Sequence, residues 1–158
     1  MRENLFKAKR IDNGGWIEGY CIASNGKTFI GMDAAEHYCV PALRWFEVDP
    51  ETVCKFTGLT DKNGKKIWKN DILMCHGNPE DLVKVLFGEF GVRNIETGSI
   101  TDKAIGWYYE VVPTDAISRC EPFCWPMPLT KDYIDRCEME VVGNIFDNKE
   151  LLQEKSDE

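Results

Sequence analysis

The sequence lacks the features that would mark a membrane protein, a secreted protein or a familiar enzyme. Its 158 residues contain no apolar run of the length, about 18 residues, that a membrane-spanning helix needs. The first residues show no apolar stretch of the kind found in secretory signals, so we expect a protein of the cytoplasm. Phosphate-binding glycine loops, the G-x-S-x-G serine elbow and the H-E-x-x-H metal motif are absent. We therefore expect no catalytic residues and no cofactor.

Positive charge is also scarce, because 19 Lys and Arg stand against 27 Asp and Glu, giving a net charge of −8. This balance opposes nonspecific binding to nucleic acids, which needs cations to displace counterions from phosphates. An alternative comes from a local cluster of lysines in the segment 62–69. There Lys62, Lys65 and Lys66 could contact a phosphate backbone, with Trp68 as a stacking surface. The plainer interpretation is that lysines at a hairpin tip aid solubility and discourage edge-to-edge pairing.

Seven cysteines without a secretory signal indicate free, reduced thiols, mostly buried as small packing groups. A zinc- or cysteine-dependent enzyme is the alternative that they raise. Zinc takes four ligands in a tetrahedron, but only two short pairs are present, namely His37 with Cys39 and Cys120 with Cys124. Adjacent strand residues point to opposite faces, so Cys75 and His76 cannot act as a nucleophile–base dyad. We therefore expect no metal site.

Short β-prone runs at close spacing predict a mainly β protein with minor α structure. Residues 5–10, 15–24 and 27–32 are expected to form an antiparallel meander. Both faces of the second run are mostly apolar, which predicts a strand that is covered on both sides. Asp49 and Pro50 suit the N-cap and first position of a helical turn, and we place the boundary between two subdomains, 1–50 and 51–158, at this point.

The second subdomain is expected to hold the remaining strands, at 53–56, 66–68, 71–75, 81–87, 92–95, 106–112 and 139–145. The pair Asn63-Gly64 predicts a type I′ hairpin turn. Gly88 and Gly91 predict a sharp turn or a bulge between two strands. Four prolines between 113 and 131 indicate a long loop, which we take as part of a loop insertion near 97–135. Asp147 or Asn148 can cap a short C-terminal helix.

The segment Phe56–Ile72 reads Phe-Thr-Gly-Leu-Thr-Asp-Lys-Asn-Gly-Lys-Lys-Ile-Trp-Lys-Asn-Asp-Ile. It resembles the signature of the YopX family of phage and prophage proteins. Residues 6–10 with 16–20 resemble the N-terminal part of that family, and residues 141–152 resemble its C-terminal signature. Asn70 stands where the family usually has glycine, a change that a left-handed backbone position tolerates.

The resemblance implies a mainly β fold whose C-terminal part is similar to an SH3-like barrel, encoded in a phage or prophage genome. It brings no known activity and no catalytic residues. The signature consists of turn and core residues, which specify a fold and not a reaction. We therefore predict a non-enzymatic cytoplasmic module that binds a macromolecular partner. We expect that partner to be a protein rather than a nucleic acid, and we expect no association with a membrane. The sequence leaves open whether the chain forms a homo-oligomer.

Overall fold

The structure is a computed structural model that describes residues 4–33, 43–113 and 125–152. It is mainly β, as predicted, with two antiparallel sheets. The chain divides into two compact units, Met1–Gly58 (unit 1) and Leu59–Glu158 (unit 2), and each is described by itself. The subdomain boundary at residues 48–53 stays a prediction, because compactness does not show which part folds alone. In the described part of the chain, no helix is long and apolar enough to cross a membrane.

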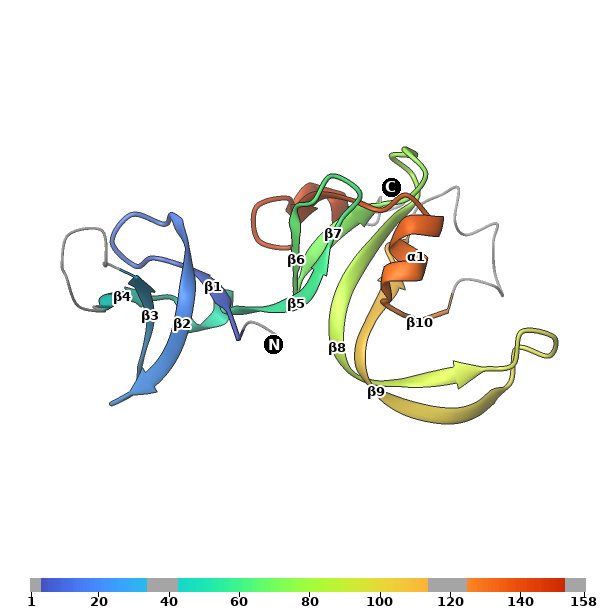
Figure 1. The fold of residues 1–158 in the computed structure, drawn as a ribbon, viewed down its shortest axis with the longest axis horizontal. Helices are drawn as coiled ribbons and strands as arrows, with labels where there is room; N and C mark the ends of the chain where they lie inside the picture. Colours follow the sequence, from blue (N-terminus) through green and yellow to red (C-terminus); the bar gives the residue numbers. More distant parts are fainter. Residues whose placement is uncertain (1–3, 34–42, 114–124, 153–158) are drawn as a thin grey trace, which may run out of the picture. The chain divides into compact units, whose positions relative to one another are not determined.

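Unit 1 contains the predicted antiparallel meander. Its strands are β1 (Phe6–Lys9), β2 (Trp16–Ser24), β3 (Lys27–Asp33) and β4 (Leu43–Val48), arranged in the order β4-β3-β2-β1 (Figure 1). β5 (Cys54–Thr60) pairs with β1 and continues into unit 2. Asn25 and Gly26 both have positive φ, at 52° and 73°, as a type I′ turn between β2 and β3 requires.

The unit 1 sheet curves around a small apolar core of Ala8, Ile17, Ile30 and Val48. The end of β4 returns to the end of β1 through a single bridge between Arg10 and Val48. One bridge is not a ladder, so the sheet is curved without being a closed barrel.

The helical turn predicted after β4 is confirmed. It is a 3-10 helix, η2 (Pro50–Thr52), and the Asp49 carboxylate caps it by accepting a hydrogen bond from the Glu51 N–H at 3.0 Å. Thr52 ties this turn to β1, because its hydroxyl oxygen accepts a hydrogen bond from the Lys9 N–H at 2.9 Å. A buried hydroxyl is satisfied in this way at low cost.

The prediction that β2 is covered on both faces is wrong. Ile17 and Gly19 are buried, but on the opposite face Tyr20 is 52% exposed and Ile22 is 46% exposed. The residue types on a strand do not show whether an apolar face packs on a core or faces the solvent. The alternation pattern alone therefore cannot distinguish a buried face from an exposed one.

Unit 2 contains a five-stranded antiparallel sheet in the order β10-β9-β8-β7-β11. Its strands are β7 (Asp71–Met74), β8 (Leu82–Arg93), β9 (Ile100–Val111), β10 (Met127–Pro128) and β11 (Glu140–Asn144). β6 (Lys66–Trp68) lies beside β5 in the other sheet. The buried core of unit 2 consists of Ile67, Leu73, Cys75, Val83, Val85, Tyr109, Leu129, Ile134 and Met139.

The sharp turn or bulge predicted at Gly88–Gly91 is wrong, because β8 continues through these residues with regular pairing. The pairing of β8 with β9 is regular up to an irregularity between Val92 and Arg93. Gly88 lies opposite Gly106 in the ladder, and both strands bend sharply midway along their length (Figure 1). Gly88 has a φ of 156°, a backbone conformation that L side chains rarely adopt, so glycine suits this point of the bend. The glycines thus mark a bent ribbon instead of a chain reversal.

Part of the segment 97–135 forms regular structure instead of a loop. β9 occupies twelve of its residues, and α1 (Lys131–Arg136) follows β10. The Thr130 hydroxyl caps α1 by accepting a hydrogen bond from the Tyr133 N–H at 3.2 Å, and Ile134 anchors the helix in the core. The short C-terminal helix is confirmed as a 3-10 helix, η4 (Lys149–Leu152), with the Leu151 N–H donating to the Asn148 carbonyl.

Candidate functional site

The hairpin that joins β5 to β6 through residues 61–65 has a different turn type from the predicted one. Only Gly64 has positive φ, at 81°, and the N–H of Gly64 donates to the Asp61 carbonyl at 3.0 Å. This is a type I turn over Asp61–Gly64 followed by a left-handed glycine, a common three-residue hairpin connection. The type I′ prediction for Asn63-Gly64 is therefore wrong, although the hairpin itself is confirmed.

The Asp61 carboxylate explains the choice of turn. Asp61 is 6% exposed, and its Oδ1 accepts hydrogen bonds from the N–H groups of Asn63 and Lys65, each at 2.9 Å. Its Oδ2 accepts from the N–H of Val141 on β11, also at 2.9 Å. One side chain thus shapes the turn and fixes it to a strand eighty residues later in the chain.

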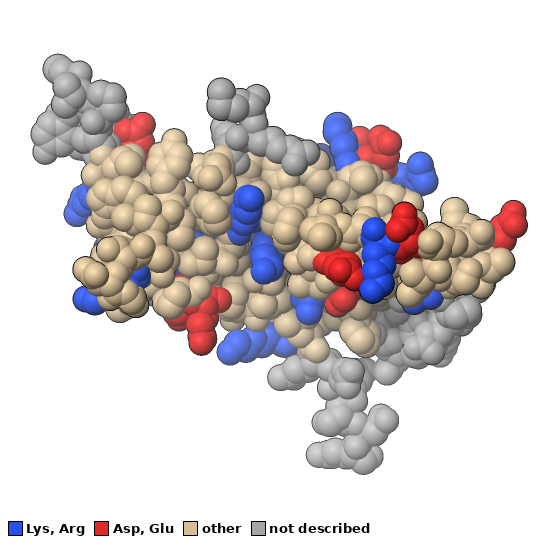
Figure 2. Space-filling model, turned by 90° about the horizontal axis from the view of Figure 1, so that it is seen from below, with Lys and Arg blue, Asp and Glu red and all other residues tan. Residues whose placement is uncertain are grey.

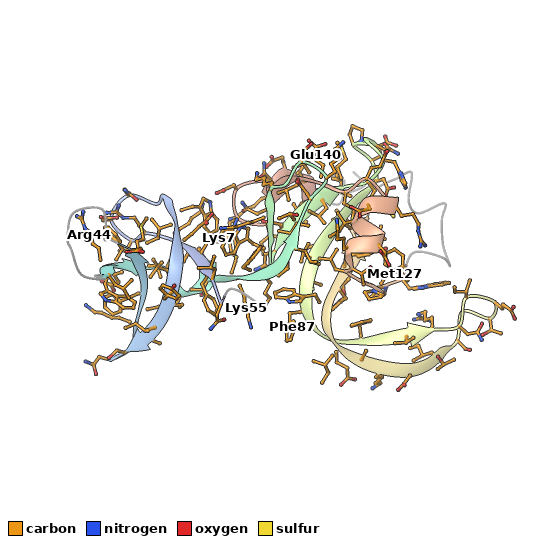
Figure 3. The ribbon with its side chains drawn as sticks, in the orientation of Figure 1. Lys7, Arg44, Lys55, Phe87, Met127 and Glu140 are labelled. Atoms are coloured by element: carbon orange, nitrogen blue, oxygen red, sulfur yellow. The ribbon has the colours of Figure 1, made fainter. Side chains whose placement is uncertain are left out.

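The candidate nucleic-acid residues on this hairpin have diverse surroundings. Lys62 forms an ion pair with Glu140 on β11 at 3.3 Å, and Figure 3 labels that glutamate. Lys65 is exposed, and Lys66 is half-buried. Trp68 is only 3% exposed, so its ring offers almost no surface for stacking on a base. The structure therefore does not bring the four candidates together as one exposed binding surface.

The residues after Trp68 also serve the fold. The Trp68 N–H donates to Asp71 Oδ2 at 2.9 Å, and Asp71 is fully buried. Asn70 has a φ of 70°, so it takes the left-handed backbone conformation that the sequence predicted at this position.

The C-terminal signature closes another tight turn. The side chain of Asn148 approaches Gly143 so closely that an added Cβ would lie 2.3 Å from its Oδ1. The same Oδ1 accepts a hydrogen bond from the Asn144 N–H at 3.2 Å. Asn144 Oδ1 in turn accepts from the N–H groups of Phe146 and Asp147, each at 2.9 Å. Both signatures thus consist of backbone-binding side chains and close approaches, and the described geometry assigns them no reaction.

The four described cysteines have free thiols: Cys54 and Cys75 are buried, while Cys21 and Cys137 are half-buried. Burial, together with the nearby Asp81 and Cys137, raises the pKa of the Cys75 thiol to about 12. The thiol thus stays protonated near neutral pH and is a poor nucleophile.

The other candidate metal ligands cannot be placed. His37, Cys39, Cys120 and Cys124 lie outside the described residues. Among residues 4–33, 43–113 and 125–152, no three His, Cys, Asp or Glu side chains lie together as a metal site would require. The expectation that the protein binds no metal stays a prediction.

A surface that the sequence analysis missed lies on unit 1. Directly paired residues share a face of a sheet, and Tyr20, Gly31 and Trp45 form one row across β2, β3 and β4. In the neighbouring rows on the same face lie Ile22, Phe29 and Leu43. We call this surface the Trp45 face and define it by Tyr20, Ile22, Phe29, Leu43 and Trp45. Leu43 is 44% exposed and Trp45 is 41% exposed, so the face is open to solvent.

Gly31 allows the indole of Trp45 to lie flat on the sheet. A Cβ at Gly31 would lie at nearly equal distances, 2.7 to 2.9 Å, from three atoms of the indole ring. Such equal distances mean that the ring covers the glycine with its face and not with its edge. The opposite face of the ring is therefore turned outward, where a partner can pack on it.

Charges around the Trp45 face are balanced. By strand register Lys7, Lys9 and Lys27 share this side of the sheet with Glu18, Asp33 and Glu47. Unit 1 carries seven Lys and Arg against eight Asp and Glu, whereas unit 2 carries twelve against nineteen. Figure 2 shows basic and acidic side chains interspersed on the face that it draws. The surface therefore does not suit a polyanion in particular.

Comparisons with known proteins place the chain by family. The model of a protein family described as YopX protein matches residues 6–153. A search of curated protein sequences found no match to the chain.

Proposed function

Since the chain belongs to the YopX family over residues 6–153, we propose that it is a phage or prophage protein that works in the cytoplasm of the bacterial host as a binding module for another protein. The observation that carries this proposal is the exposed Trp45 face. Monomeric proteins rarely expose contiguous apolar patches of this kind unless they bind something there. Tryptophan and tyrosine are also the side chains that contribute most at protein interfaces.

A protein fits the Trp45 face better than a nucleic acid does. Ile22 and Leu43 bury well against apolar side chains but offer no flat surface for a base. The rim holds as many carboxylates as lysines, so counterion release would contribute little. An apolar centre with a mixed, charged rim is the usual anatomy of a protein–protein interface.

The proposal includes an SH3-like barrel for the C-terminal part. Its support is the bend of β8 and β9 at Gly88 and Gly106, because a small barrel needs strands that bend at defined glycines. An experimental structure in which the strands of residues 59–158 closed into a ring would bear this out.

Photo-crosslinking in cells tests the binding function. A photoreactive phenylalanine analogue at Tyr20 should give a discrete adduct with another protein during infection or lysogeny. Trp45→Ala in the same chain should abolish that adduct, because the partner packs on the indole. The analogue placed at Lys65, on the hairpin, is the matched control and should give no such adduct.

Three outcomes would contradict the proposal: no discrete adduct from Tyr20, an equal adduct from Lys65, or an adduct removed by nuclease and not by protease. The last two would favour the basic hairpin or a nucleic-acid partner. In that case Lys65→Glu with Lys66→Glu should weaken binding to short RNA or DNA, steeply so with rising salt.

A further inference from the structure

We propose that the partner protein reaches unit 1 with an extended segment, which pairs as an added strand with the outer edge of β4 beside the Trp45 face. We call this segment of the partner the guest strand. The inference rests on the proposed function, since it names the form in which the partner meets that surface. Its support lies in the backbone groups that β4 turns outward, in the lack of protection along this edge and in the charge of Arg44.

β4 turns the backbone groups of Leu43 and Trp45 away from its neighbour β3. The Glu47 carbonyl points to the outer edge, where it accepts a hydrogen bond from the Ile11 N–H at 3.1 Å. Outward and inward residues alternate in an antiparallel ladder, and the ladder of β3 with β4 is regular throughout. The N–H and C=O groups of Leu43 and Trp45 therefore point outward as well. Within the described residues, β4 is the end strand of its sheet and no other strand pairs with these groups.

The chain already uses part of this edge for strand pairing. Residues 9–11 run antiparallel along the end of β4, where Arg10 forms a bridge with Val48. Beyond them the chain turns away, since the Gly14 N–H donates to the Arg10 carbonyl at 2.9 Å. A cleft of about 150 Å³ lies at this point and is lined by Ile11, Asp12, Phe46 and Glu47. A guest strand along residues 43–45 would thus continue a line of pairing that the chain has begun, and its end would reach the cleft.

β4 lacks the usual devices that keep an exposed edge from pairing, namely lysine, proline, a bulge or very short length. It has six residues, none of them Lys or Pro, and its pairing with β3 is regular. The end strands of the unit 2 sheet do have such devices. β10 has two residues, one of them Pro128, and β11 has an irregularity between Val141 and Gly143. The indole of Trp45 lies over Gly31 of β3, so it leans away from the outer edge of its own strand.

The side chains of β4 define what the guest strand should carry. Alternate residues of a strand lie on opposite faces of the sheet, so guest residues opposite Leu43 and Trp45 would lie on the Trp45 face and should be apolar. The residue between them would lie beside Arg44 (Figure 3). Arg44 is exposed and forms no ion pair within the described residues, and its guanidinium stacks over the Phe46 ring at 5.0 Å. A stacked guanidinium keeps its in-plane N–H groups available for a carboxylate, so we expect the guest pattern apolar–acidic–apolar.

A short peptide tests this pattern. The probe is a capped, fluorescein-labelled peptide Thr-Val-Glu-Val-Thr, and the control peptide has Lys in place of Glu. In fluorescence polarisation with the full chain, the Glu peptide should bind weakly and about threefold or more tightly than the Lys peptide. Arg44→Glu should reverse that preference, which damage to the fold cannot imitate. Equal binding of the two peptides, or binding of neither, would overturn the inference.

Proline at Leu43 tests the backbone pairing in cells. Leu43→Pro removes an outward N–H without removing a bond to β3, so it should abolish the photo-adduct from Tyr20. Leu43→Thr removes the same leucine but keeps the N–H, and it should only weaken that adduct. Hydrogen exchange by NMR is a second measurement that needs no variant. The Leu43 and Trp45 amides should exchange more slowly with the Glu peptide bound, and unchanged exchange at both amides would overturn the pairing.

The two proposals can fail separately. A Tyr20 adduct with another protein that Leu43→Pro and Leu43→Thr weaken equally overturns the guest strand and leaves the proposed function in place. An adduct of twice the mass of the chain would identify a second copy at this surface and would overturn both proposals. Absence of any adduct also overturns both.

Discussion

Replacement of Asp61 tests whether the family signature is a structural device. The carboxylate accepts three backbone hydrogen bonds, two within the hairpin turn and one from Val141 on β11. A hydrogen bond to a charged group contributes about 1.5–3 kcal/mol to stability. Asn63 and Lys65 are exposed, so water can replace the acceptor for their N–H groups, but Val141 is half-buried. We therefore expect Asp61→Ala to lose roughly 3 kcal/mol of unfolding free energy, well below the sum of three full bonds.

Asp61→Asn separates charge from shape. The amide keeps one acceptor oxygen, but its NH₂ group would replace the other oxygen. It would then face either the turn N–H groups of Asn63 and Lys65 or the N–H of Val141. The loss should be about 2 kcal/mol, because a buried donor is left without an acceptor. Asp102→Asn, an exposed carboxylate on β9, is the matched control and should change stability by less than about 0.5 kcal/mol.

Urea unfolding followed by circular dichroism measures these losses, with an unchanged dependence on urea as the sign that only stability has changed. Hydrogen exchange by NMR adds a local probe. The Val141 amide should exchange on the order of a hundredfold faster in Asp61→Ala, as a loss of roughly 3 kcal/mol implies. If Asp61→Ala were as stable as Asp102→Asn, the structural role of the signature would be refuted.

Three further predictions concern single residues of unit 2. Gly143→Ala should lower the free energy of unfolding in urea by about 2 kcal/mol, because its Cβ would lie 2.3 Å from Asn148 Oδ1. Gly106→Ala is the control, since no atom lies within 4 Å of its added Cβ, and equal losses in the two variants would contradict the prediction. Asn70→Ala should lower the free energy of unfolding by about 1 kcal/mol, because alanine is strained at the left-handed φ of this position. Asn70→Gly should be at least as stable as the wild type, and an Ala variant as stable as the Gly variant would contradict the prediction. Burial raises the pKa of Cys75 from 9.0 to about 12, so the folded state holds the thiol proton more tightly than the unfolded state does. Stability should therefore fall as pH rises from 9 toward 12, by up to about 1.4 kcal/mol per pH unit from this group, and Cys75→Val should remove that part of the slope; an alkaline series that showed the same slope in both proteins would disprove it.

Local backbone chemistry was predictable from the sequence where a residue acts on its immediate neighbours. Asp49 caps η2 as expected, and Asn70 adopts the left-handed conformation expected from its place in the family pattern. The pair Asn63-Gly64 correctly predicted a hairpin but not its turn type. The carboxylate of Asp61 binds two turn N–H groups there and imposes a different turn from the one at Asn25-Gly26, where both residues have positive φ.

Long-range features were harder to predict. Gly88 looked like a turn residue, and only its partner across the ladder, Gly106, shows that it serves a bend. The outer face of β2 was taken as covered, although Tyr20 and Ile22 are half-exposed there. Since apolar side chains mark both cores and binding surfaces, that pattern held the signal for the Trp45 face, but strand pairing was needed to interpret it.

The bond between Asp61 and Val141 also sets an order of events during synthesis. β7 takes β11 as its neighbour, and the hairpin donates the Lys62 N–H to the Met139 carbonyl. All these contacts wait until residues 139–144 have left the ribosome. The pairings among β1, β2, β3 and β4 need no residue beyond Val48, so they can form while the rest of the chain is still being made. Until the last strand arrives, the nascent β7 exposes an unpaired edge and the buried side chains Ile72 and Leu73, so a ribosome that stalls late would release a chain prone to aggregate.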